Sequence, residues 1–97
     1  MATKKDLEDY VAELNRKYCK NTKNHLVIDQ AYGRQYQVCL TGKSYFRGSK
    51  EHLRKGGLRG YLPVTPYHDT ATNTINKLYR EVANGYLQQT IKYREHR

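Results

Sequence analysis

The chain has 97 residues and a formal net charge of +9 at pH 7, and 37% of its residues are hydrophobic. This length predicts one domain, residues 1–97, with a thin core and little depth for a closed active-site cavity. No apolar run approaches the roughly 18 residues that a membrane span needs. The first residues lack the hydrophobic stretch of a secretory signal, so we expect a cytoplasmic protein in which Cys19 and Cys39 are reduced thiols.

Residues 3–18 are predicted to form an amphipathic helix. Apolar and tyrosine side chains recur at spacings of three and four, as on one face of a helix: Leu7, Tyr10, Val11, Leu14 and Tyr18. Thr3 is the expected N-cap, and Asp6 completes a variant of the capping box.

Two short strands are predicted next, at residues 25–31 and 35–41. Both are rich in β-branched or aromatic residues, and the turn between them contains Gly33, which readily takes a positive φ. Period-two alternation places five side chains on one face of this hairpin: Leu26, Ile28, Tyr36, Val38 and Leu40. A two-stranded hairpin is marginal alone, so we expect helices to cover that face.

Residues 42–68 are predicted to form a long basic loop, because Pro63 and Pro66 interrupt regular structure. Connections of this length inside a small domain are usually either functional or disordered. The window from Lys43 to Tyr61 carries six cations against one acid, Glu51. The candidate nucleic-acid-binding residues all lie in it: Lys43, Tyr45, Arg47, Lys50, Arg54, Lys55, Arg59 and Tyr61. Lysine and arginine contact phosphates, and tyrosine rings stack on unpaired bases.

A single long helix is predicted from about residue 70 to 92, with Asp69 or Thr70 as its cap. Leu87 and Ile91 fall off its main apolar stripe. They are predicted to mediate self-association as a homodimer, unless the helix bends at Gly85 and buries them within one chain. The expected core combines this helix with the preceding elements: Leu7, Val11, Leu14, Leu26, Ile28, Val38, Leu40, Ile75, Leu78 and Val82.

The sequence points to no catalytic residues, metal or cofactor. The four histidines are scattered, without the paired spacing of a zinc site. Gly42-Lys43-Ser44 matches the tail of a phosphate-binding loop, but Gln37 stands where its first glycine belongs. His68 and Asp69 are candidates for a base and its orienting group, although a loop residue and a helix cap explain them better. We therefore expect a protein that is not an enzyme.

The opening KKDLEDYVAELN (residues 4–15), the hairpin that follows, and the Leu-Tyr and Gly-Tyr-Leu motifs of the last helix (78–79 and 85–87) resemble small phage and prophage proteins of unassigned function. The resemblance covers residues 4–41 and about 72–88. It implies a helix–hairpin–helix fold, a phage or mobile-element setting and no catalytic residues. The basic insert at 42–68 is a departure from that pattern.

Two functions fit these observations. The first is a non-enzymatic nucleic-acid-binding accessory protein, because concentrated positive charge on a small protein favours an anionic partner. The second is a protein-interaction module that recognises an acidic surface and inhibits or redirects a host or defence protein, since tyrosines are also enriched in protein interfaces. Basic charge does not separate the two.

Overall fold

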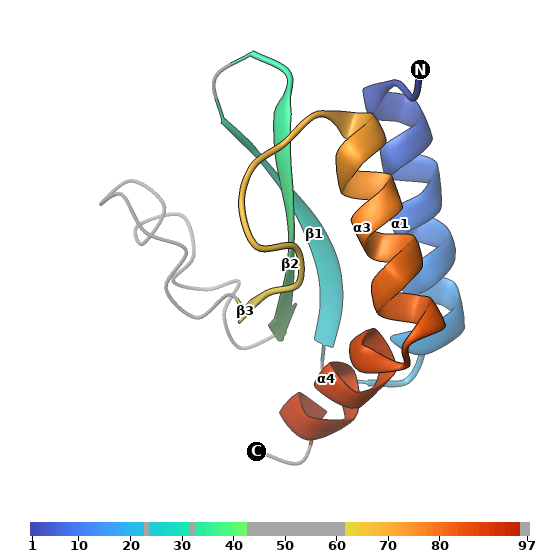
Figure 1. Ribbon diagram of the computed structural model, residues 1–97. Helices are drawn as coiled ribbons and strands as arrows, with labels where there is room; N and C mark the ends of the chain where they lie inside the picture. The colour runs from blue at the N-terminus through green and yellow to red at the C-terminus, as the bar shows by residue number, and fades with distance from the viewer. Residues whose placement is uncertain (23, 32, 43–61, 96–97) are drawn as a thin grey trace.

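A computed structural model of the chain describes residues 1–22, 24–31, 33–42 and 62–95. It is an α+β domain in which helices pack on one side of an antiparallel sheet (Figure 1). The predicted fold class is confirmed. The elements, in chain order, are α1 (Lys4–Tyr18), β1 (Asn24–Ala31), β2 (Gln35–Gly42), β3 (Leu62–Pro63), α3 (Ala71–Ala83) and α4 (Tyr86–Glu95).

Helix α1 begins as its sequence predicts. The Thr3 hydroxyl accepts a hydrogen bond from the backbone N–H of Asp6 at 3.2 Å, and the Asp6 carboxylate accepts one from the Thr3 N–H at 2.8 Å. The backbone and side-chain hydrogen bonds with Thr3 hold the pKa of Asp6 below its ordinary value. This reciprocal pair satisfies two N–H groups that an uncapped helix leaves without an acceptor.

Strands β1 and β2 form the predicted hairpin. Leu26 lies opposite Leu40 and Ile28 opposite Val38, so these side chains share one face, as expected. Gly33 in the turn has φ of +69°, a left-handed conformation that costs glycine little. The face that carries Leu26 and Leu40 is covered by α1, α3 and α4 (Figure 1).

The predicted loop 42–68 contains a strand that the sequence analysis missed. Leu62 and Pro63 form β3, which pairs antiparallel with β2 through Leu40–Leu62 and Cys39–Pro63. A proline has no N–H to donate to a ladder, so it is tolerated on an edge strand, and β3 is at the edge of the sheet. Pro63 is therefore accommodated in this strand without preventing its pairing.

The predicted single C-terminal helix is wrong, because the helix divides at Gly85. Helix α3 ends with Asn84 as its C-cap, Gly85 takes φ of +76°, and α4 starts again at Tyr86 in a new direction (Figure 1). The change of direction turns Leu87 and Ile91 into the core, where they are 0% and 4% exposed. The predicted homodimer surface at Leu87 and Ile91 is wrong for the same reason.

The core lies between the helix layer and the sheet. Eight of the ten predicted core residues are buried, while Ile28 and Val82 are partly buried against the same cluster. The buried cluster is completed by Cys19, Tyr36, Ala71, Leu87 and Ile91. No helix in the described part of the chain is long and apolar enough to cross a membrane.

Candidate nucleic-acid interface

The eight residues predicted to bind nucleic acid fall within 43–61, outside the described residues. The structure does describe where the chain leaves and re-enters the sheet around them. Residue 42 ends β2, residue 62 starts β3, and the two strands are hydrogen-bonded neighbours. The segment 43–61, hereafter the basic segment, is thus attached at both ends to adjacent strands.

The end of the sheet from which the basic segment departs is itself basic. Gly42 pairs with Asn24, which follows α1 after a short turn. The last turn of α1 carries Arg16 and Lys17, and Lys20 follows it; all three are exposed. Cations are favourable at a helix C-terminus because they oppose the helix dipole. The same placement gathers positive charge beside the attachment point of the basic segment.

Two of the cations on the far side of the molecule are paired with carboxylates. At the start of α1, Lys5 pairs with Asp9 at 3.2 Å. In the middle of α3, Lys77 pairs at 3.1 Å with Asp69, which precedes the helix. By contrast, Arg16, Lys17 and Lys20 make no ion pair with another described residue. Three exposed cations without an ion pair among the described residues therefore gather at the C-terminal end of α1, while Lys4 and Arg34 are exposed at the opposite end.

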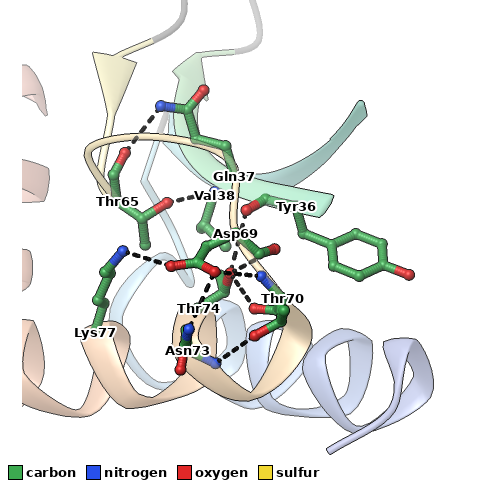
Figure 2. A network of polar contacts seen from close by, with 9 residues as sticks. All are labelled: Tyr36, Gln37, Val38, Thr65, Asp69, Thr70, Asn73, Thr74 and Lys77. Atoms are coloured by element: carbon green, nitrogen blue, oxygen red, sulfur yellow. Dashed lines mark hydrogen bonds and ion pairs between the residues drawn. The ribbon is translucent and has the colours of Figure 1, made fainter. Parts of the chain in front are cut away.

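Between β3 and α3, residues 64–68 form a loop that protrudes from the edge of the sheet. This loop, hereafter the edge bulge, is tied to β2 through Thr65. The Thr65 hydroxyl accepts a hydrogen bond from the Val38 N–H at 3.0 Å, and the Gln37 amide donates to the Thr65 carbonyl at 3.0 Å (Figure 2). Backbone N–H groups of residues 64 and 65 both donate to the Val38 carbonyl, at 2.8 and 3.2 Å. These bonds substitute for the ladder that β3 no longer continues.

Asp69 joins the edge bulge to the start of α3. Its backbone exchanges hydrogen bonds with Tyr36 at 2.7 and 2.9 Å, which closes the edge bulge against β2. Its carboxylate accepts from the Thr70 N–H, the Asn73 amide and Lys77 (Figure 2). The same three donors, in that order, hold the pKa of Asp69 below its ordinary value. Asp69 thus helps to cap α3, although Thr70 is the N-cap.

His68 turns away from Asp69 and contacts β1 instead. Its Nε2 lies 2.6 Å from an Asp29 carboxylate oxygen, so Asp69 does not orient this imidazole. Tyr67 lies under Lys77, whose Nζ is 3.7 Å from the ring centroid. Burial alone lowers the pKa of Lys77, but the contacts with Tyr67 and Asp69 outweigh it and leave the pKa above its ordinary value. These contacts fasten the edge bulge to β1 and α3.

A thiol beside a histidine and a carboxylate can act as a catalytic nucleophile. The candidate group of this kind consists of Cys39, His68 and Asp29. The Cys39 thiol is 0% exposed, and burial, reinforced by the charge of Asp29, raises its pKa to about 12. A reactive cysteine needs a lowered pKa and access to solvent. Cys39 therefore serves as a small core residue. Among the described residues, no cluster of His, Cys, Asp and Glu has a geometry that holds a metal ion.

A hollow of about 710 Å³ lies between the starts of α1 and α3 and the hairpin turn. Thr3 and Lys4 line it from α1, Thr72 from α3, and Arg34 and Tyr36 from the hairpin. The Ala2 N–H donates to the Thr72 hydroxyl at 2.9 Å, which ties the N-terminal residues to α3 on one side of the hollow. This hollow could not be predicted from the sequence, because it depends on the parallel placement of two helices distant in the chain.

Comparison of the chain with protein-family models, with curated proteins and with solved structures finds no match.

Proposed function

We propose that this protein is a non-enzymatic nucleic-acid-binding accessory protein whose basic segment contacts the phosphate backbone. One observation carries the proposal. The basic segment, which contains six cations and one acid, is attached at both ends to paired strands. Arg16, Lys17 and Lys20 are exposed at the same end of the sheet. Contiguous positive charge raises the local concentration of a polyanion and releases its counterions on binding.

The asymmetry of charge over the described residues supports this proposal. A net charge that serves only solubility needs no particular placement, whereas a binding surface needs its cations on one side. Lys5 and Lys77 are paired with Asp9 and Asp69, which weakens the attraction of these two cations for a polyanion. We therefore place the phosphate-contacting surface at the basic segment and the C-terminal end of α1.

The resemblance to phage and prophage proteins supplies a setting for the proposal: a phage or mobile element acting in the cytoplasm of its host. In that setting, a small basic protein assists the handling of nucleic acid without carrying out chemistry on it. Because phosphate contacts alone carry no sequence information, we propose binding that is largely independent of sequence.

The proposal is tested by measuring affinity for duplex and single-stranded DNA and RNA over a range of salt concentrations. Arg54→Ala/Lys55→Ala should weaken binding to all sequences alike. If both side chains contact phosphates, the slope of log affinity against log salt flattens by about 1.8 on duplex DNA, or about 1.4 on single strands.

Lys4→Ala/Lys5→Ala is the matched control, because it removes the same charge from exposed positions at the start of α1, away from the points where the basic segment is attached. We expect it to leave the salt slope close to that of the wild type. An Arg54→Ala/Lys55→Ala variant with unchanged affinity and slope would reject the proposal. Absence of nucleic-acid binding, together with recovery of one specific acidic protein, would instead support the protein-interaction function.

A further inference from the structure

We propose that the outward face of α4 is a stacking surface for the bases of a single-stranded nucleic acid, with Tyr86 and Tyr93 as the two stacking rings. This inference rests on the proposed function and deepens it, because it assigns a second contact surface and a preference for unpaired strands. Neither tyrosine is among the candidate binding residues predicted from the sequence.

The orientation of α4 follows from its buried side. Leu87 and Ile91 point into the core, so the residues on the opposite side of the helix point outward. Tyr86 and Tyr93 are 55% and 62% exposed. They are seven residues apart, which brings them to nearly the same side of the helix about 10.5 Å apart along its axis. That separation is about three times the 3.4 Å spacing of nucleotides along a strand.

The surroundings of these rings are polar and cationic. Gln89 is exposed on the same side of α4 as the rings, and Lys92 is exposed about 100° round the helix from Tyr93. Residues 82–94 contain no acid, although Glu81 precedes them and Glu95 follows them. Arg80, also exposed, lies in the last turn of α3 just before the bend. A ring for a base and a nearby cation for its phosphate are the two elements by which proteins bind single strands with little sequence preference.

Charge complementarity favours a nucleic acid over a protein on this face. The centres of protein interfaces are enriched in aromatic residues but depleted of lysine. Here Lys92 directly precedes Tyr93 and no large aliphatic side chain is exposed on the described part of α4. A phosphate-bearing partner satisfies both the rings and the lysine.

The position of α4 extends the proposed interface. α4 packs against β1, whose first residue, Asn24, pairs with Gly42 at the point where the basic segment begins. Figure 1 shows α4 at the same end of the molecule as the end of α1 and the end of β2. One strand can therefore contact the phosphate-binding end and the α4 rings together.

The test measures the affinity of the full chain for poly-dT, poly-U and a DNA duplex of matched length, at several salt concentrations. Tyr86→Ala/Tyr93→Ala should lower the affinity for single strands at least about tenfold, with little change in the salt slope or in duplex affinity. Tyr86→Phe/Tyr93→Phe keeps the rings and should bind single strands as the wild type does. Tyr67→Ala, which removes a similarly exposed ring from the edge bulge, is the control and should have no effect on single-strand binding.

The outcomes separate this inference from the proposed function. If Tyr86→Ala/Tyr93→Ala binds single strands as the wild type does while Arg54→Ala/Lys55→Ala is weakened, the α4 surface is rejected and the proposed function stands. An equal loss on duplex and single strands, or a loss that the phenylalanine variant shares, also rejects stacking. A wild-type protein that binds none of the three probes overturns both proposals.

Discussion

Asn15 lies on α1 yet completes the hydrogen bonding of β1. Its side-chain amide donates to the Leu26 carbonyl at 3.0 Å, and its oxygen accepts from the Leu26 N–H at 2.7 Å. β1 is an edge strand, and an open edge is a template for pairing with another chain. One asparagine thus both docks the helix on the sheet and closes part of an exposed edge.

The burial of individual side chains distinguishes two core positions that the sequence treats alike. Leu14 is buried, whereas Val82 is only partly buried against the core. Leu14→Ala should lower the free energy of unfolding by about 2–5 kcal/mol, because it leaves a cavity. Val82→Ala should cost roughly 1 kcal/mol, because solvent already reaches part of this site. Urea unfolding followed by circular dichroism measures both, and equal losses would contradict this assignment of burial.

The two free cysteines provide a second residue-scale prediction. Burial raises the pKa of Cys19 to about 11, against an opposing hydrogen bond from the Leu26 backbone, and that of Cys39 to about 12. The folded state therefore holds these protons more tightly than the unfolded state does. The stability this contributes is complete below about pH 9 and is lost as the pH rises through 11 and 12.

At pH 8, the native protein should react with iodoacetamide at least about a hundredfold more slowly than the urea-unfolded protein, because the thiolate is the reactive form. Mass spectrometry of the alkylated chain gives both rates. Cys39→Ala should also reduce the loss of stability above pH 9 relative to the wild type. Rapid labelling of Cys39 in the native state would show that the thiol is accessible and would contradict its burial.

At the scale of elements, the edge bulge depends on two buried threonines with different hydrogen-bonding roles. Thr65→Val removes the acceptor of the Val38 N–H and should cost about 1–3 kcal/mol, because a buried donor is left without a partner. The Thr74 hydroxyl lies 2.7 Å from the Thr70 carbonyl, which already accepts from the Thr74 N–H. Thr74→Val should therefore cost less. Urea unfolding compares them, and faster hydrogen exchange at Val38 in Thr65→Val alone would confirm the mechanism.

The bend between α3 and α4 depends on Gly85. Gly85→Ala should destabilise the protein by about 1–2 kcal/mol, since the left-handed conformation is costly for alanine. A Cβ added there meets no atom within 4 Å, so the cost arises from the backbone alone. Gly85→Asn should cost less, because asparagine tolerates this conformation.

Gly33→Ala is the matched control for the bend. Gly33 has a similar φ and equally open space, but it lies in the hairpin turn. Thermal unfolding of the Gly33 and Gly85 variants should give comparable losses. A Gly85→Ala variant as stable as the wild type would mean that α3 and α4 can join without penalty.

The elements also show what the sequence could predict. The capping box, the apolar stripe of α1 and the alternation in the hairpin are local patterns, and they predicted α1, β1 and β2 to within about one residue. The edge bulge and the hollow between α1 and α3 were missed because they arise from contacts between residues far apart in the chain. Gly85 was predicted as a possible bend. Helical periodicity alone could not decide whether such a bend buries Leu87 and Ile91 or leaves them on a surface for self-association. The eight candidate binding residues were chosen by charge and composition, and they remain a prediction.

At the scale of the whole molecule, α4 closes the end of the core instead of presenting an apolar face to a second copy. Leu87→Ala should lower the free energy of unfolding by about 2–5 kcal/mol, because this side chain is 0% exposed. It should leave the sedimentation coefficient of the folded protein unchanged. Analytical ultracentrifugation compares the variant with the wild type. A wild-type dimer that Leu87→Ala converts to a monomer would show that Leu87 mediates self-association.

The pairing of β2 with β3 determines where this fold tolerates changes of sequence and length. The chain enters and leaves the segment 43–61 at neighbouring positions of one sheet, so the segment's two ends are held together whatever lies between them. The entropy of closing such a loop grows slowly, by about 0.6 kcal/mol for each doubling of its length. Lengthening, shortening or replacing this stretch should therefore alter what the protein recognises far more readily than it alters whether the protein folds. The junction at Leu40 and Leu62 is a natural acceptor for grafted sequences, and relatives of this chain should differ there first.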